Sequence, residues 1–278
     1  METPQPFHVL LRNISEAPLH KPDGVFRILH FSDIHLGLLP HLGEIFNKRF
    51  IGAVNHFFRR RHRLHPEYLE TLASMLPALA PDMTVFSGDL SSVATPEELQ
   101  HAAEKLRPFM EASDFLFVPG NHDAYVKDAL PHLETIGKVL NANRWAPSDL
   151  PVEYRTQGLR FCLINAAVPL PLLLSCGILS PETQQRIDAL FAPGDQAIAI
   201  CHFPAFSPTG GSTGWRHGLR GETFLQNKLR DGTFSLLLSG HDHTPFIYRT
   251  ENGAVQLCAG SLTLKGSYAL IDIPRESR

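Results

Sequence analysis

The sequence contains little cysteine, and no two cysteines stand at a redox or zinc-binding spacing. Four cysteines are scattered through 278 residues, and three of them lie in apolar runs of strand length. A small buried thiol is the ordinary role of a cysteine in such a run. This usage argues against a disulfide framework and predicts a reduced, cytoplasmic compartment.

Long apolar runs and a strong charge of one sign are also missing. No run approaches the roughly 20 apolar residues that a membrane-spanning helix needs. The first twenty residues do not show the basic start and apolar stretch of a secretory signal. The formal net charge of −3 does not favour a nucleic-acid partner. No G-x-S-x-G motif is found, which argues against a serine hydrolase of the nucleophile-elbow type.

What is present suits one large α/β domain over residues 24–278. The chain is 43% hydrophobic, enough for a sizeable core, and residues 1–23 read as a weakly structured lead-in. Three apolar strand-like runs, 26–31, 83–86 and 115–118, alternate with helical stretches. These helical stretches are expected at about 43–79 with a break near Pro66, at 96–110 and at about 126–140. This βαβαβ order predicts parallel strands joined by helical crossovers.

The second half of the sequence is richer in strands. Seven strand-like runs, VEYR, LRFCLIN, AIAIC, FSLLL, PFIYR, AVQLC and YALID, are interrupted by helices at about 181–191 and 221–230. We find no internal repeat and no low-complexity linker. Two sheets packed together and covered by helices accommodate this pattern.

Five of the strand-like runs are followed by residues that commonly bind metal ions. These residues are Asp33 and His35, then Asp89, Asn121 and His202, and finally His241 and His243. In open α/β sheets, ligands bind beyond the carboxyl ends of the strands, so these side chains are expected to converge. Glycines at 88, 120 and 240 allow sharp turns and close approach of the backbone. In extended backbone, both members of each i,i+2 pair would point to one side.

Seven ligands are too many for one tetrahedral ion, and they suit two ions that share a bridging carboxylate. The donors are carboxylate, amide oxygen and imidazole, with no thiolate. This set favours manganese, with iron or zinc as alternatives. Two ions roughly 3.5–4 Å apart hold both oxygens of an in-line displacement and generate hydroxide near neutral pH.

The motifs D-x-H, GD, GNHD, a lone His after a strand, and G-H-x-H, in this order, resemble the calcineurin-like metallophosphoesterase family. The resemblance implies a four-layer αββα sandwich with two mixed sheets. It implies hydrolysis of phosphoric esters or anhydrides by a hydroxide between two metal ions. One ion would take Asp33, His35, Asp89 and His243, and the other Asp89, Asn121, His202 and His241, with Asp89 bridging. His122 would be the catalytic histidine, and Asp123 would orient it.

Two residues near these motifs, His30 and Asp242, are expected to have structural roles. His30 lies inside the first predicted strand and is expected to be a hydrogen-bonded core histidine. Asp242 points away from its neighbours by the period-2 rule and is expected to be a turn residue. A non-catalytic scaffold of the same fold is a remote alternative, because it would require a missing ligand or a missing His122.

A basic, aromatic insertion at about 43–66 bears on the identity of the substrate. Residues 45–66 contain no acidic residue and six of the 25 basic residues, with phenylalanines spaced as on one helix face. Such a helix can lie on an anionic membrane surface, and the alternative is a core-packed helix with a solvated basic end. Arg59 and Arg60 are candidate substrate contacts. The insertion would allow peripheral contact with the inner membrane surface.

This insertion, with the N-K-R-F stretch and the GNHDAY context, resembles hydrolases of the lipid A pathway that cleave UDP-2,3-diacylglucosamine. A class III cyclic-nucleotide phosphodiesterase, or a broad-specificity phosphodiesterase, carries the same metal motifs and stays an alternative. The substrate is therefore expected to be a phosphodiester or a nucleotide pyrophosphate. A Gly-rich segment, 209–222, offers Trp215, Arg216 and Arg220 as further contacts, unless it is an ordinary surface loop.

Overall fold

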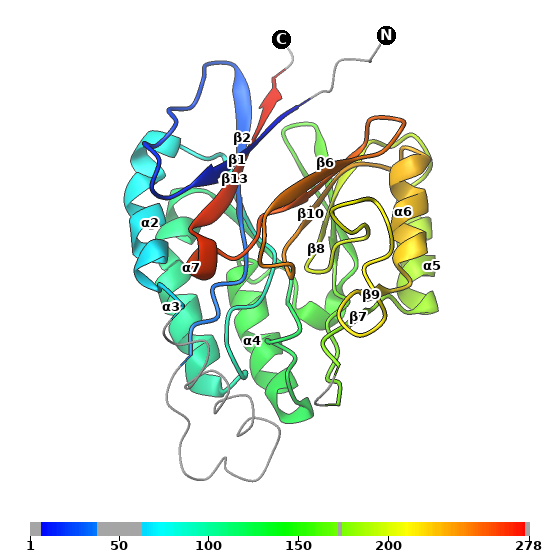
Figure 1. Cartoon of the computed structure of the whole chain (residues 1–278), viewed down its shortest axis with the longest axis horizontal. Helices are drawn as coiled ribbons and strands as arrows, with labels where there is room; N and C mark the ends of the chain where they lie inside the picture. The colour runs from blue at the N-terminus through cyan, green and yellow to red at the C-terminus, as the bar shows by residue number, and fades with distance from the viewer. Residues whose placement is uncertain (1–6, 38–62, 172–173, 276–278) are drawn as a thin grey trace.

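The computed structural model describes residues 7–37, 63–171 and 174–275, and Figure 1 shows two sheets lying face to face. The first sheet has five strands in the order β1-β13-β2-β3-β4. Strands β2, β3 and β4 are parallel, whereas β13 pairs antiparallel with both β1 and β2. The bounds are β1 (His8–Asn13), β2 (Val25–Phe31), β3 (Met83–Phe86), β4 (Asp114–Phe117) and β13 (Ser267–Pro274).

The second sheet has six strands in the order β11-β12-β10-β8-β6-β5. Its central strands β12, β10, β8 and β6 are parallel, and its edge strands β11 and β5 are antiparallel. A short parallel pair, β7 with β9, stands apart from it. The bounds are β5 (Val152–Thr156), β6 (Leu159–Ile164), β7 (Gly177–Ile178), β8 (Ala197–Cys201), β9 (Leu219–Arg220), β10 (Phe234–Ser239), β11 (Phe246–Arg249) and β12 (Val255–Cys258).

Helices cover the outer face of each sheet, which confirms the predicted four-layer α/β sandwich with two mixed sheets. Helices α2, α3 and α4 lie on the five-stranded sheet, and α5 and α6 lie on the six-stranded sheet (Figure 1). No helix in the described ranges is long and apolar enough to cross a membrane. The bounds are α2 (Glu67–Leu79), α3 (Pro96–Ala112), η3 (Lys127–Ala129), α4 (Leu130–Leu140), η4 (Pro147–Asp149), α5 (Pro181–Leu190), α6 (Glu222–Arg230) and α7 (Leu262–Lys265).

The strands are apolar on both faces because both faces are buried. In β2, Ile28 belongs to the core between the two sheets, whereas Leu29 and Phe31 belong to the core under the helices. In β10, Leu236 and Leu237 are divided between these two cores in the same way. Largely apolar runs are therefore expected here, and the sequence shows them at 26–31 and 234–238, with Arg27, His30 and Ser235 as the polar exceptions.

Two segments differ from expectation or lie outside the description. Residues 8–13, expected in a weakly structured lead-in, form edge strand β1, which pairs along its whole length with β13. Its partner lies more than 250 residues later, so no local pattern reveals the pairing. The predicted helix at 43–79 is found as α2 from Glu67 onward. The earlier part of that prediction, with most of the basic insertion, lies outside the described residues.

His30 is the hydrogen-bonded core histidine that its position predicts. Its side chain is fully buried, with Nε2 at 2.9 Å from Ser87 Oγ, and burial lowers its pKa to about 3. In the unfolded chain a histidine has a pKa of about 6.5. Between these two pKa values, His30 is protonated in the unfolded chain and neutral in the folded chain. The free energy of unfolding therefore falls as the pH drops from 6.5 towards 3.

Replacing His30 with glutamine is expected to flatten this acid sensitivity, because an amide does not titrate. Between pH 6.5 and 4.5 the free energy of unfolding of the unmodified protein should fall by about 2 kcal/mol more than that of His30→Gln. Urea unfolding at several pH values measures the difference. His132→Gln, which alters an exposed histidine, should keep the original slope. Equal slopes for His30→Gln and the unmodified protein would contradict the assignment.

Candidate metal centre

The carboxyl ends of β2, β3, β4, β8 and β10 bring the seven predicted ligands to one edge of the two sheets. Three groups of side chains have ligand atoms that all lie within 4.8 Å of one another. These groups are Asp33, His35 and His243; His35, Asp89 and His122; and Asp33, Asp89 and His202. The two remaining predicted ligands, Asn121 and His241, face each other, with Asn121 Oδ1 at 2.9 Å from His241 Nδ1.

The first group directs two imidazole nitrogens and one carboxylate oxygen at a common point. His35 Nε2 and His243 Nε2 lie 3.0 Å apart, at 3.6 and 3.5 Å from Asp33 Oδ1. Asp33 Oδ1 is buried and has no hydrogen-bond partner among the residues that the structure describes. The other oxygen, Asp33 Oδ2, accepts the backbone N–H of His241 at 3.0 Å. Because a buried unpaired carboxylate oxygen is costly, this arrangement suits a bound cation.

Asp89 lies between this group and the next one. Its Oδ2 atom is 3.7 Å from His35 Nε2 and 3.5 Å from His202 Nε2. Its Oδ1 atom accepts the backbone N–H of His122 at 2.8 Å. One carboxylate oxygen therefore faces imidazoles on two sides, which is the geometry of a bridging ligand.

The second set of donors is fixed by hydrogen bonds to backbone carbonyls. His202 Nδ1 donates to the Ser87 carbonyl at 2.7 Å, so Nε2 is the unprotonated nitrogen of the neutral ring. Within the described part of the chain, this buried Nε2 atom has no hydrogen-bond partner. His241 Nε2 contacts the His217 carbonyl, while Nδ1 faces Asn121 Oδ1. A neutral imidazole has one N–H for these two acceptors, so one nitrogen presents a lone pair, as a metal ligand does.

The charges of the cluster are strongly coupled. Burial raises the pKa of Asp33 to about 7, with a further contribution from the Asp89 charge. Burial also opposes ionisation of Asp89, but the imidazoles of His202, His122 and His35 hold its pKa well below its usual value. Burial disfavours protonation of His202, yet the Asp89 and Asp33 carboxylates raise its pKa to about 9. Buried carboxylates at this density require a positive counter-charge.

The backbone is strained at these ligands. Asp33, His35, Asp89 and His241 have φ values of 55°, 42°, 61° and 68°, in the left-handed region that side-chain-bearing residues rarely adopt. Each such conformation costs about 1–3 kcal/mol and is typical of functional sites. The two side chains were expected to point to one side because the backbone between them would be extended, and this explanation is wrong for Asp33 and His35. Left-handed turns, not strand alternation, direct Asp33 and His35 to the same point.

The glycines of the motifs are required by the ligands themselves. A Cβ atom on Gly120 would lie 2.2 Å from Asp89 Oδ1, and one on Gly240 would lie 2.5 Å from Asp33 Oδ2. Any larger residue would displace a carboxylate of the cluster. These glycines were expected to let the backbone approach an ion, whereas they let it approach the two aspartates.

A family model described as calcineurin-like phosphoesterase matches residues 26–245, which include every one of these ligands. The chain belongs to the calcineurin-like phosphoesterase family. It is accordingly a metal-dependent phosphoric ester hydrolase of the two-metal kind, as the order of motifs predicted. Among curated protein sequences, none matches this chain.

Several solved structures share the fold of this chain. A dimetal phosphatase from Danio rerio superimposes with a TM-score of 0.57 at 14% identity, covering 89% of this chain and 92% of that one. Purple acid phosphatase PPD1 from yellow lupin gives 0.51 at 14% identity, covering 87% and 44%. Phosphopantetheinyl hydrolase from Mycobacterium tuberculosis gives 0.50 at 12% identity, covering 86% and 90%. At these identities the likeness concerns the fold.

In this phosphoesterase, His122 lies at the half-buried side of the cluster. Its ring centroid is 4.8 Å from that of His35, and its ring stacks on Tyr125 at 5.7 Å. Its Nδ1 atom is 2.6 Å from the Ser92 carbonyl oxygen. This contact fixes Nδ1 as the protonated nitrogen of the neutral ring. Neither Ser92, which acts through its main chain, nor Tyr125 was singled out from the sequence.

Asp123 does not orient His122 as predicted. Its carboxylate accepts four backbone N–H groups, at 2.8–3.2 Å, from Gly120 and from three consecutive residues after β3: Asp89, Leu90 and Ser91. Asp123 therefore fixes the loop that carries Asp89. The prediction failed because adjacency in sequence was taken for contact, while backbone donors from another loop surround this carboxylate.

The segment 213–220 of the phosphoesterase lies against the metal ligands. The His217 carbonyl contacts His241 Nε2, and the guanidinium groups of Arg216 and Arg220 lie 5.3 and 5.8 Å from the ring of Trp215. The predicted substrate contacts Trp215, Arg216 and Arg220 therefore lie within three residues of His217, which contacts a metal ligand. The other two, Arg59 and Arg60, lie outside the described residues.

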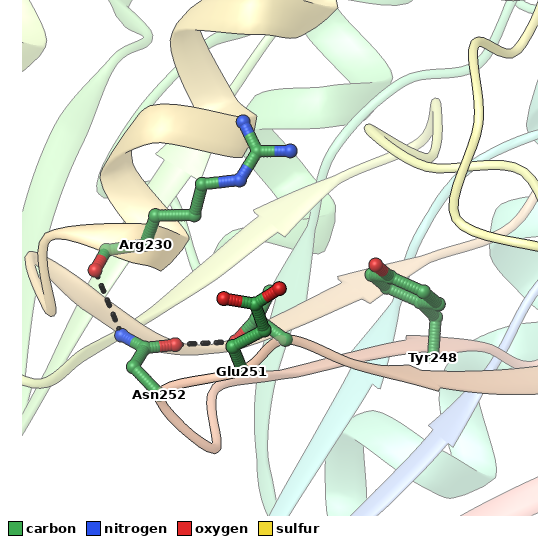
Figure 2. A pocket seen from close by; sticks show the side chains of 5 residues that line it. Arg230, Tyr248, Glu251 and Asn252 are labelled. Atoms are coloured by element: carbon green, nitrogen blue, oxygen red, sulfur yellow. Dashed lines mark hydrogen bonds between the residues drawn. The ribbon is translucent and has the colours of Figure 1, made fainter.

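A separate cavity of about 250 Å³ lies beside the end of α6 (Figure 2). It lies between the end of α6 and the turn from β11 to β12, and it is lined by Arg230, Tyr248, Thr250, Glu251 and Asn252. This turn precedes the amino end of β12, whereas the metal ligands follow the carboxyl ends of parallel strands. The amide of Asn252 already donates to the carbonyls of Leu229 and Arg230.

Proposed function

We propose that this phosphoesterase hydrolyses a phosphodiester or nucleotide pyrophosphate with two divalent ions bound at the described cluster. The proposal rests above all on Asp89, whose Oδ2 atom faces imidazoles of both ligand sets. One ion is assigned to Asp33, His35, Asp89 and His243, and the other to Asp89, Asn121, His202 and His241.

The donor set fits such ions. Two buried atoms of the cluster, Asp33 Oδ1 and His202 Nε2, have no hydrogen-bond partner in the described ranges and would gain one from a cation. Oxygen and imidazole donors without a thiolate favour manganese, with iron or zinc as alternatives. Two such ions, when bound, polarise the phosphoryl group and supply hydroxide near neutral pH.

The chain's own groups complete the chemistry. With Nδ1–H of His122 held by the Ser92 carbonyl, a second proton on Nε2 gives the imidazolium, and this Nε2–H would pass its proton to the leaving-group oxygen or stabilise the negative charge there. Asp123 acts as a positioning residue, because its carboxylate holds the loop that presents Asp89.

The proposed substrate is UDP-2,3-diacylglucosamine, hydrolysed at its pyrophosphate in lipid A synthesis. The support is the basic aromatic stretch at 45–65, which follows the Asp33 and His35 motif directly and enters the chain at the carboxyl end of β2. Specificity is commonly built on insertions at this end of a sheet. The proposed location is cytoplasmic, with residues 45–65 in peripheral contact with the inner membrane surface. The competing substrate is a cyclic nucleotide.

A substrate panel with manganese tests the proposal. UDP-2,3-diacylglucosamine should be hydrolysed with a higher kcat/KM than cyclic AMP or bis-p-nitrophenyl phosphate, and a chelator should abolish all turnover. Rescue of a lipid A-pathway mutant by this chain would support the same assignment. A higher kcat/KM for cyclic AMP would favour the cyclic-nucleotide phosphodiesterase function. Absence of metal-dependent turnover on every substrate would refute the metal-centre proposal.

Variants in the 45–65 stretch separate a lipid substrate from a soluble one. Changing Phe50, Phe57 and Phe58 to polar residues should lower kcat/KM for the lipid substrate at least ~10-fold, about the contribution of two buried CH₂ groups. Hydrolysis of bis-p-nitrophenyl phosphate should stay nearly intact. A triple change of Arg59, Arg60 and Arg61 to glutamate should act similarly and weaken binding to anionic vesicles in a salt-dependent way.

The control for these variants is the triple change of the same arginines to lysine, which keeps the charge. It should retain most of the lipid activity. Equal losses on both substrates, together with a lower melting temperature, would mean that the stretch only packs on the core. Unchanged lipid activity in the glutamate variant would favour the cyclic nucleotide.

A further inference from the structure

Trp215 is the one aromatic among the large hydrophobic residues that are exposed in the described ranges. Its side chain is 64% exposed, and the other three members of this set, Leu10, Val139 and Leu190, are aliphatic and less exposed. A tryptophan that folding leaves in water contributes little to stability, whereas tryptophan is enriched where proteins bind ligands and partners. Its position therefore calls for a binding role.

Two arginines flank the Trp215 ring, and both keep their charge available. Neither Arg216 nor Arg220 has a carboxylate within ion-pair distance in the part of the chain that the structure describes. The acidic residue that follows them, Glu222, accepts hydrogen bonds from the backbone N–H and hydroxyl of Thr213. Guanidinium groups of this kind are well suited to bind a phosphate.

Backbone hydrogen bonds hold this segment in place at the edge of the metal centre. Gly218 N–H donates to the Gly214 carbonyl at 2.7 Å, closing a turn around Trp215. On the far side of the turn, Gly177 N–H donates to the Gly218 carbonyl at 3.0 Å. The His217 carbonyl contacts the His241 imidazole. Since Trp215 precedes His217 by two residues, their Cα atoms are at most ~7 Å apart.

We propose that Trp215 is a stacking surface for the nucleobase of the substrate, and that Arg216 and Arg220 hold a phosphate of the same nucleotide. This inference rests on the proposed function, and it narrows the substrate to a nucleotide ester or nucleotide pyrophosphate. The base stacks on the exposed indole, the adjacent phosphate is paired by a guanidinium, and the scissile phosphate reaches the ligands beyond His217. Stacking accepts any base, so the arginine contacts and the metal centre set the register of the phosphates.

Binding can be tested without turnover by using Trp215 as a fluorescent reporter. The chain has two tryptophans, and Trp145 packs against Tyr154, so Trp145→Phe leaves Trp215 as the single emitter. Titration with UMP in the presence of manganese should quench this emission, whereas methyl phosphate should not. Unchanged emission at millimolar UMP would overturn the proposal. A response to anionic vesicles in place of UMP would also overturn it and assign Trp215 to a lipid surface.

Kinetics on two substrates with the same scissile bond test the role in recognition. UDP-glucose carries a base, and dimethyl pyrophosphate does not; phosphorus NMR follows both. Trp215→Ala should raise KM for UDP-glucose about 5- to 150-fold, the range for loss of one stacked base, with kcat changed little. Trp215→Phe should restore most of the affinity. Hydrolysis of dimethyl pyrophosphate, which has no base to stack, should change much less than that of UDP-glucose in both variants.

The two experiments separate this inference from the proposed function. Turnover of UDP-glucose with an unchanged KM in Trp215→Ala would refute the stacking role while leaving the phosphoesterase assignment in place. Quenching by UMP in a protein that hydrolyses neither pyrophosphate, and no substrate of the panel above, would support nucleotide binding and refute the proposed reaction.

Discussion

An Asp89→Asn variant is expected to lose bound metal and nearly all turnover together. The Oδ2 atom of Asp89 lies 3.7 Å from His35 Nε2 and 3.5 Å from His202 Nε2, between the two proposed ligand sets. Only a charged carboxylate at this point offsets the mutual repulsion of two divalent ions. Turnover should fall by at least ~10³-fold, the scale of a single essential group in hydrolases.

Metal analysis of the purified variant, alongside its kcat, measures both losses. The matched control is Asp242→Asn, which removes a nearby half-buried carboxylate that stands outside the three ligand groups. Asp242→Asn should keep two metal ions per chain and most of the activity. An Asp89→Ala protein that is active and still binds two metal ions would refute the two-metal assignment.

A His122→Ala variant is expected to keep its metal ions and to lose about 10²- to 10⁴-fold in kcat, the usual range for a general acid or base. Because Nδ1–H is bonded to the Ser92 carbonyl, we assign the proton donated to the leaving group to Nε2 of the protonated ring. The loss should shrink for substrates with good leaving groups such as p-nitrophenolate, because these need little protonation.

Metal content decides between this role and direct coordination. The ligand atoms of His122, His35 and Asp89 lie within 4.8 Å of one another, so a metal-binding histidine is the competing role. A comparison of p-nitrophenyl and alkyl esters, with metal analysis of each sample, distinguishes the two. An emptied metal site in His122→Ala, with equal losses on all leaving groups, would assign His122 to coordination.

Much of the fold was predictable because the two-sided burial of its strands leaves a local signature. The apolar runs at 26–31, 83–86 and 115–118 became β2, β3 and β4 with ends displaced by a residue or so. The sequence also predicted the start of α3 at residue 96. In the structure Thr95 caps this helix by accepting the Glu98 N–H, and Pro96 occupies its first turn. Strand β1 was not predicted, because its hydrogen bonds go to a strand at the other end of the chain.

The ligand types and their order were likewise visible, but the reasons for their convergence were not. Extended backbone was expected at Asp33 and His35, and both have left-handed conformations. Asp123 was expected beside the His122 ring, and it binds backbone N–H groups of another loop. Side-chain chemistry is a property of the residue, whereas backbone strain and hydrogen-bond partners are set by loops that meet only in the folded chain.

The sequence by itself therefore determined the class of the protein: a two-sheet α/β phosphoesterase whose Asp, Asn and His residues follow strand ends. Strand periodicity and ligand chemistry are local properties, so both can be recognised in the sequence alone. Only the tertiary structure decided that Asp89 Oδ2 stands between His35 and His202, and that the His217 carbonyl contacts His241. These contacts join segments tens to hundreds of residues apart. Their geometry follows from how the two sheets and their loops pack, which no local pattern encodes.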